Sequence, residues 1–378
     1  MESILLIKGI IILVIFALSL GIAAYETYFE RVVAAWIQDR VGPDRAGWHG
    51  MFQPLADAGK LFFKEDFIPA IADKWLFIIG PGIAMFTSLL SSAVIPFGET
   101  LKIGDLLVPI QGVDVNIGVL YVFGIVALGV YGILIGGWAS NNKYSLYGAI
   151  RAASQNISYE IALGLCLIAV IVVSESLSLR EIVAQQHGMN WNIFYQPVGF
   201  ILFMTCSLAE LNRVPFDLPE TESELVTGYL TEFGSMKMGL FMFGEYVNMF
   251  VSSAIIASLY FGSYNYPGMD AVREFMIGQF GDVAGHNVAT LLGTVVFFAK
   301  ICFFIFVIMW IRWTLPRFRY DQLMKLGWQW MVPLAVVNLI VIAVATLSGY
   351  PLLVSWLGMG AFLLVYYGGR TIYEKRVN

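Results

Sequence analysis

The chain has 378 residues, of which 58% are hydrophobic and only 13% are charged, and its formal net charge is −5. Soluble domains carry about 25% charged residues, so this composition excludes an ordinary soluble protein. A helix of about 20 apolar residues crosses a bilayer, whereas an outer-membrane barrel shows short segments of period-2 alternation. The apolar runs here are long and apolar on all sides. We therefore predict an all-α, polytopic integral membrane protein.

Nine apolar stretches are predicted to be membrane-spanning helices. They cover roughly residues 4–28, 74–96, 117–138, 157–175, 194–210, 237–262, 290–311, 331–348 and 352–368. No Pro/Ser-rich linker separates a soluble module, which indicates one membrane domain over residues 1–378. The first stretch is long for a signal peptide, and no convincing small-residue cleavage site follows it.

The first loop, residues 29–73, is long and semi-polar. Its apolar residues follow helical spacing in two pieces, Val32, Val33, Trp36 and Ile37, then Phe52, Leu55, Gly59 and Phe62. Gly42-Pro43-Asp44 lies between the pieces and is typical of a turn. This pattern predicts amphipathic helices at the membrane surface. The alternative is a solvated linker with scattered apolar residues.

Lysine and arginine gather in alternate loops. If the segment after the first span is cytoplasmic, that side carries Arg31, Arg40, Arg45, Lys60, Lys64, Lys143, Arg151, Arg213, Lys237, Arg312, Arg317, Arg319, Lys325, Arg370, Lys375 and Arg376. The other side carries Lys8, Lys102, Arg180 and Arg273. The positive-inside rule then places the N-terminus outside and the C-terminus in the cytoplasm.

Ionisable residues lie at membrane depth. Glu26 and Glu30 close the first stretch, Glu160 opens the fourth as a helix start, Glu210 ends the fifth, and Glu245 and Lys300 lie inside the sixth and seventh. A charge at the bilayer centre costs about 2.5–3.5 kcal/mol on insertion scales. These groups must therefore be paired, hydrated or protonated, which is the condition for a proton relay. The alternatives are headgroup placement for Glu26 and Glu30, a favourable position at a helix start for Glu160, an interfacial position for Glu210, and a buried structural pair for Glu245 and Lys300.

The loop at residues 211–236 is acidic, with Asp217, Glu220, Glu222 and Glu224 close to Glu210. Apolar residues alternate with these acids, which favours a loop folded into a cleft or against a partner, with Arg213 as the nearest cation. The alternative is a solvated loop whose prolines only break helices. The outer loops at 97–116, 176–193 and 263–289 show no obvious chemistry, and Pro267-Gly268 and Gly281 predict an irregular excursion in the last.

The chain shows no means of holding a redox cofactor or a metal. Cys166, Cys206 and Cys302 lie far apart in the sequence, and no CxxC motif is present. His49, His187 and His286 lie outside the predicted spans, so axial ligation of a membrane haem is excluded. Nucleotide-binding glycine motifs are also absent from the sequence.

Several runs together resemble the H subunit of proton-pumping NADH:quinone oxidoreductase, respiratory complex I. They occur in family order from about residue 20 to 330: Glu30-Arg31, Gln38 to Pro43, Gln53 to Leu61, Gly137 to Asn141, Arg151 to Glu160, Ala209 to Glu224, Glu245-Tyr246, Trp310 to Arg312 and Pro316 to Asp321. The resemblance implies a subunit that joins the redox arm to the membrane arm, forms a quinone access channel and chamber, and couples quinone reduction by NADH to proton translocation.

The resemblance also implies roles for individual residues. The quinone chamber would involve Glu30, Arg31, Arg40, Asp57 and Lys60; the quinone-responsive loop would involve Arg213, Asp217, Glu220, Glu222 and Glu224. The proton path would involve Glu160, Glu210, Glu232 and Glu245, to which we add Lys300 for its depth; the cytoplasmic interface would involve Arg312, Arg317 and Arg319. Glu26 matches no family position and receives no role.

The expected substrate is a lipid quinone, ubiquinone or menaquinone. FMN and iron–sulfur clusters are expected in partner subunits, and the expected partners are the peripheral-arm iron–sulfur and quinone-site subunits and the proton-pump subunits. The extra span at 352–368 and the long loop at 263–289 depart from the mitochondrial form and favour a bacterial inner (plasma) membrane. Three alternatives stay open: a coupling subunit of a membrane-bound hydrogenase-type ion-translocating complex, a self-standing ion channel or transporter, and a structural anchor, which would leave the deep carboxylates unexplained.

Overall fold

The computed structural model describes residues 2–104, 106–219 and 226–349, together with residues 356, 358 and 360. The predicted span at 352–368 falls almost wholly outside these residues, and so do Glu220, Glu222 and Glu224. Helices dominate the described part, and one antiparallel two-stranded sheet pairs β1 (Thr100–Ile103) with β2 (Leu106–Pro109). The all-α, polytopic fold class is therefore confirmed.

Within the described ranges, seven helical segments are long and apolar enough to cross a membrane. They are α1 (Glu2–Ile37), α3 (Lys74–Ser92), α4 (Gly118–Ala139), α5 (Lys143–Ser174), α10 (Ser235–Tyr260), α12 (Asp282–Thr314) and the continuous run of α13 (Tyr320–Lys325), η3 (Leu326–Met331) and α14 (Val332–Ser348). Shorter elements are η1 (Trp48–Gly50), α2 (Gln53–Phe63), α6 (Leu179–Gln185), α7 (Asn192–Tyr195), α8 (Pro197–Glu210), η2 (Gly228–Leu230) and α11 (Met269–Phe280).

The fifth predicted span differs from the structure. It is divided at Gln196 into α7 and the 14-residue α8. At 1.5 Å per residue α8 is about 21 Å long, which is less than the roughly 30 Å hydrocarbon core. Pro197 accounts for the break, because a residue before proline is disfavoured in the α conformation.

Several helices extend beyond their predicted bounds, and for α1 and α5 this changes the interpretation of a predicted element. α1 continues to Ile37, so the first of the two predicted surface helices is the end of the first span and not a separate element. α5 begins at Lys143, so the prediction that Glu160 opens a helix is wrong. The polar first half of α5 remains helical because its side chains find partners: Gln155 donates to the Ala209 carbonyl at 2.7 Å, and Tyr159 donates to the Leu323 carbonyl at 3.0 Å.

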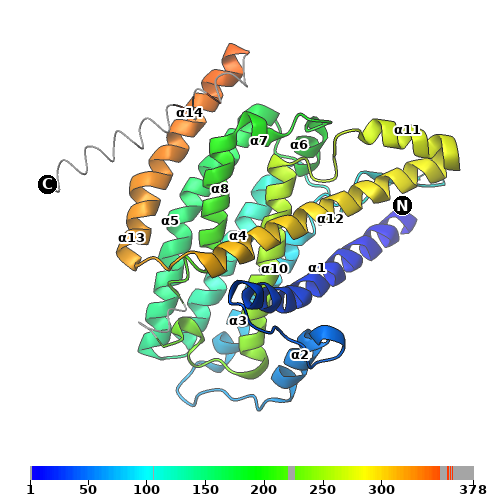
Figure 1. Cartoon of the computed structure of the whole chain (residues 1–378). Coiled ribbons are helices and arrows are strands. Elements are labelled where there is room, and N and C mark those ends of the chain that lie inside the picture. Colours follow the sequence, from blue (N-terminus) through cyan, green and yellow to red (C-terminus); the bar gives the residue numbers. More distant parts are fainter. Residues whose placement is uncertain are drawn as a thin grey trace.

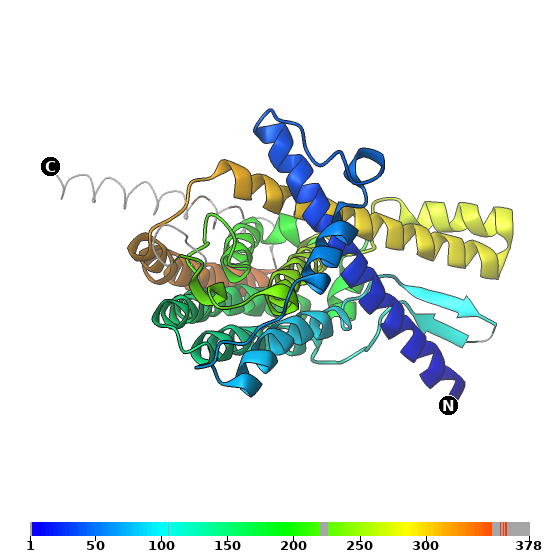
Figure 2. The same cartoon turned by 90° about the horizontal axis from the view of Figure 1, so that it is seen from below.

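The long helices form a bundle in which α4, α5, α8 and α10 run side by side, while α1 and α12 cross α10 obliquely (Figures 1 and 2). Glycines allow a close approach within it, between α3 and α4. A Cβ atom at Gly80 would lie 3.0 Å from the Cα of Gly136, and one at Gly132 would lie 2.8 Å from the Ala84 nitrogen. Such small-residue contacts are typical of helix packing in membranes.

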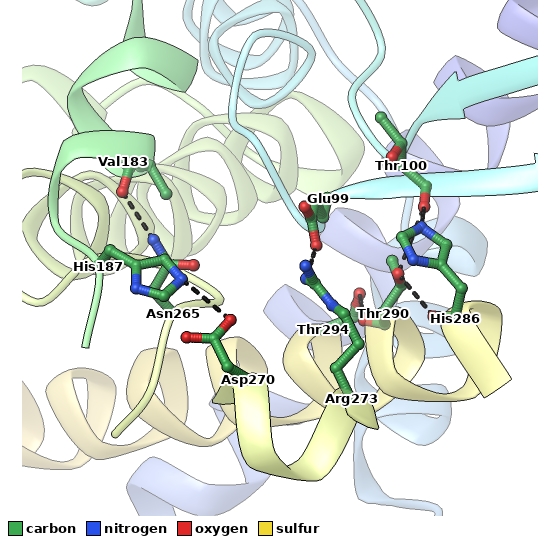
Figure 3. A network of polar contacts seen from close by, with 10 residues as sticks. All are labelled: Glu99, Thr100, Val183, His187, Asn265, Asp270, Arg273, His286, Thr290 and Thr294. Atoms are coloured by element: carbon green, nitrogen blue, oxygen red, sulfur yellow. Dashed lines mark hydrogen bonds and ion pairs between the residues drawn. The ribbon is translucent and has the colours of Figure 1, made fainter. Parts of the chain in front are cut away.

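A polar network joins the loops at the end of the bundle opposite α2 (Figure 3). His286 Nε2 lies 2.9 Å from the Thr100 carbonyl of the hairpin, Arg273 of α11 pairs with Glu99, and His187 lies 3.5 Å from Asp270. The predicted irregular excursion at 263–289 is thus wrong in part, because it contains α11. The glycines that predicted it flank this helix with positive φ, at positions 268 and 281.

Candidate functional site

A buried cluster of charges forms where α1, α10, α12 and the loop after α8 meet. The cluster consists of Glu30, Arg213, Glu245, Tyr246 and Arg312. Glu30 lies about two helical turns before the end of α1, and Glu245 and Tyr246 are adjacent on α10. Four segments that are distant in sequence therefore supply one polar centre inside an apolar protein.

The Glu30 carboxylate is fully engaged. Arg213 Nη1 donates to its Oε2 at 2.9 Å, and the Tyr246 hydroxyl donates to the same oxygen at 2.8 Å. Arg312 pairs with its other oxygen, Oε1. Only 6% of the Glu30 side chain is exposed, so the two guanidinium groups replace the water that a carboxylate would otherwise bind.

Arg213 connects the two carboxylates of the cluster. Its Nη2 lies 3.8 Å from Glu245 Oε2, and its guanidinium lies 4.1 Å from the ring centroid of Tyr246. Tyr229 donates to Glu245 Oε1 at 3.0 Å. Burial alone would lower the pKa of the Arg213 guanidinium, but Glu30, Tyr246 and Glu245 together raise it above its ordinary value. Arg213 therefore stays charged.

Two small cavities, each of about 40 Å³, meet at Glu210. One extends between Glu210 and Glu245 and has a polar wall that includes Asn156, Asn212 and Asn248. A water molecule needs at least roughly 10–15 Å³ of such space together with polar partners, so this cavity can hold about two or three waters. The other cavity is mainly apolar. The Glu160 carboxylate also acts electrostatically on Glu210.

The described part of the acidic loop is folded into the protein. Phe216, Asp217 and Leu218 are buried, and Gln155 of α5 donates to the Phe216 carbonyl at 2.6 Å. Asp217 pairs with Arg317 at 3.0 Å. The alternative of a solvated loop is therefore wrong for these residues.

The residues predicted to line a quinone chamber divide into two groups. Glu30 faces the interior, whereas Arg31 turns toward α2 and pairs with Asp57 at 2.6 Å, on a partly exposed surface. Arg40 and Lys60 are exposed, and Arg40 donates to Gln38. The apolar face predicted for α2 is also exposed, with its residues Phe52, Leu55 and Phe62.

Two members of the predicted proton path lie apart from the cluster. Glu232 accepts a hydrogen bond from Asn142 at 2.6 Å. Lys300 donates to the carbonyls of Phe261, Ser263 and Asn265, each at 2.7 Å, just beyond the end of α10. Glu245 and Phe261 are separated by about 24 Å along a helix, at 1.5 Å per residue. Lys300 and Glu245 are therefore not a buried pair.

The three predicted interface arginines also differ in position. Arg312 belongs to the cluster, Arg317 forms an ion pair with Asp217, and Arg319 is exposed at the start of α13. Among the residues that the structure describes, no three His, Cys, Asp or Glu side chains gather as a possible metal site.

Sequence reasoning missed the hydroxyl and amide partners of the site, chiefly Tyr246, Tyr229 and Asn142. A signal was present for Tyr246, because it adjoins Glu245 in an apolar helix and a buried tyrosine hydroxyl normally finds a partner. Tyr229 and Asn142 lie in loops or at helix ends. No spacing in the sequence connects them to their acids.

Comparison with known proteins gives a consistent family. The model of the NADH dehydrogenase family matches residues 9–343. The H subunit of NADH-quinone oxidoreductase from Flavobacterium johnsoniae is 56% identical over 342 residues, covering 90% of this chain and 95% of the relative. The H 1 subunit from Cytophaga hutchinsonii is 56% identical over 337 residues, covering 89% and 96%, and the H 1 subunit from Geobacter sulfurreducens is 48% identical over 341 residues, covering 87% and 92%. This chain therefore belongs to the family formed by the H subunits of NADH-quinone oxidoreductase.

Proposed function

We propose that this chain is the membrane subunit of an NADH-quinone oxidoreductase that helps to form the quinone channel and chamber and couples quinone reduction to proton translocation. The relatives bear the name of this complex, and the chain covers nearly their whole length. The observation that carries the coupling role is the buried cluster of Glu30, Arg213, Glu245 and Arg312.

The cluster supports coupling through its charge balance. Its two carboxylates and two guanidinium groups sum to zero net charge, which suits a buried site. Adding or removing one proton leaves an uncompensated charge at low dielectric, where Coulomb interactions are stronger than in water. A quinone that takes up protons as it is reduced can therefore change the charge state of the site.

A path for protons can continue from the cluster through Glu245. The cavity that Asn156, Asn212 and Asn248 help to line reaches from Glu245 to Glu210, and Glu160 acts on Glu210 from α5. Waters in this cavity would connect the carboxylates by hydrogen bonds. We propose that Glu160, Glu210 and Glu245 carry protons in this order or its reverse. Glu232 would serve at the edge of the path, whereas Lys300 would support the backbone just beyond the end of α10 and relay no proton.

The surroundings of the site suit a quinone and soluble partners. The exposed apolar face of α2 and the adjacent Arg31–Asp57 pair would border the channel for a lipid quinone. The chain would receive electrons from iron–sulfur clusters in partner subunits, which would also hold FMN. Arg317 and Arg319 would face these subunits in the cytoplasm, with the N-terminus on the periplasmic side of a bacterial inner membrane.

Purification of the intact complex through a tag on this chain tests the proposal. We expect flavin and iron–sulfur subunits to copurify with inhibitor-sensitive NADH:quinone activity. In the assembled complex, Glu210→Gln should lower quinone turnover or the proton yield, while Glu274→Gln on the exposed side of α11 should change neither. A hydrogenase partner in place of the flavin subunit would refute the proposal, and so would wild-type quinone turnover together with full proton yield in an assembled Glu210→Gln complex.

A further inference from the structure

Glu26 has no place in the cluster described above, yet it lies on the same buried stripe of α1. Ile15, Ser19, Ala23, Glu26 and Glu30 are all buried, and their spacing of three or four residues puts them on one helix face. Glu26 thus precedes Glu30 on α1 by about one turn, or about 6 Å, and lies closer to the centre of the helix. Tyr25 and Phe29, which flank this stripe on α1, are exposed.

The Glu26 carboxyl group is buried without a partner. Only 2% of the residue is exposed, and among the described residues neither carboxyl oxygen has a hydrogen-bond partner. The burial comes from this chain alone, so a side chain of a partner subunit does not reach the group. A carboxylate in such a place needs a positive charge within its own protein.

Among the residues that the structure describes, the charges near Glu26 do not supply one. Arg213 is the cation that acts most strongly on Glu26. The charges of Arg213 and Arg312 are, however, already balanced by the carboxylates of Glu30 and Glu245. Glu30 acts on Glu26 as a like charge. From α12 the thiol of Cys302 is within electrostatic reach, and α10 contributes the hydroxyl of Tyr246 next to Arg213, neither of which is a cation.

We propose that Glu26 is an additional proton-binding site of this protein, a carboxylic acid that shares one protonation equilibrium with Glu30 through Arg213. With Glu30 ionised, the proton stays on a Glu26 carboxyl oxygen. When Glu30 gains a proton, Arg213 loses a counter-charge, and Glu26 releases its own proton to water or to a neighbouring acceptor. The two carboxyl groups thus exchange one negative charge beside one guanidinium group, as coupled sites do. Only the use of this proton in coupling rests on the proposed function.

Infrared spectroscopy of the purified complex at neutral pH tests the protonation directly. The carbonyl stretch of a protonated carboxyl group is separate from the bands of a carboxylate, and it shifts in D₂O. We expect the difference between wild type and Glu26→Gln to contain one such acid band. The matched control, Glu274→Gln, removes an exposed carboxylate of α11 and should give no acid band. If Glu26→Gln does not assemble, Glu26→Asp should change the frequency of the same band.

A second infrared measurement tests whether the protonation of Glu26 depends on the charge of Glu30. In Glu30→Gln the Arg213 guanidinium has lost a counter-charge, so Glu26 should ionise and its acid band should disappear. No acid band assignable to Glu26 in the wild type would overturn the proposal, and an acid band of unchanged intensity in Glu30→Gln would overturn the shared equilibrium. Neither result depends on quinone reductase activity. A complex without that activity would refute the proposed function and leave the infrared result intact.

Discussion

Replacing Arg213 with methionine tests whether the buried charges act as one network. The change removes the charge-assisted hydrogen bond to Glu30, worth about 1.5–3 kcal/mol, and the contact with the ring of Tyr246, worth about 2 kcal/mol when desolvated. Glu30 keeps Arg312, so its charge remains paired. The expected loss is about 3.5–5 kcal/mol, a large share of the roughly 5–15 kcal/mol that stabilises a typical domain.

The double variant Arg213→Met with Glu245→Gln separates charge balance from packing. The single variant leaves the cluster with one surplus negative charge, and the second change removes that surplus. We therefore expect the double variant to be more stable than the single one, with a coupling of about 0.5–3 kcal/mol. Additive losses would contradict this.

The assay is thermal unfolding of the purified complex at one fixed scan rate, because unfolding of a large complex is often irreversible. Arg45→Met is the matched control, since this arginine is exposed and its loss should change stability by less than about 0.5 kcal/mol. If Arg213→Met unfolds at the same temperature as Arg45→Met, the cluster does not stabilise the protein and the argument from buried ion pairs fails.

Three further outcomes follow from the contacts. Tyr246→Phe keeps the ring but removes the donor to Glu30, so it should cost about 1.5–3 kcal/mol in the same assay; wild-type stability would show that this hydrogen bond is unimportant. Lys300→Met should speed amide hydrogen exchange just after α10 at unchanged proton yield, and the reverse pattern would place Lys300 in the proton path. Arg31→Ala breaks the partly exposed pair with Asp57, so it should cost less than about 1 kcal/mol yet raise the KM for quinone; unchanged KM would count against a chamber at this surface.

Apolar periodicity and length predicted the helices well because hydrocarbon imposes them. A backbone in a bilayer must satisfy its own hydrogen bonds, so a long apolar run has few alternatives to a helix. The errors arose where polar residues interrupt that signal. The first half of α5 looked like a loop because of Arg151 and Gln155, although Gln155 is satisfied by carbonyls at the end of α8 and in the segment that follows it.

The members of the site could be predicted more easily than their pairing. Buried acids are costly, so Glu30 and Glu245 stood out in the sequence. Arg213 was predicted as the cation of the acidic loop, but its contacts with α1 and α10 depend on helix packing between segments that lie 183 residues apart in the case of Glu30. The same packing pairs Arg312 with Glu30 at the edge of the cluster, where 28% of its side chain remains exposed, so its predicted interface role stays a prediction.

In the proposed function, the arrangement of the cluster would let a proton added to Glu30 change the electrostatic interaction between Arg213 and Glu245. Arg213 is shared by Glu30 and Glu245, and its two amino groups face them at 2.9 Å and 3.8 Å. Neutralising Glu30 removes a counter-charge from Arg213 and so strengthens the net attraction between Arg213 and Glu245, which lies at the wall of the cavity that reaches Glu210. Since interactions at low dielectric are screened little, this effect needs no large movement of the backbone. Under the proposed function, Arg213 is the group through which a change in protonation on α1 would act on Glu245 of α10.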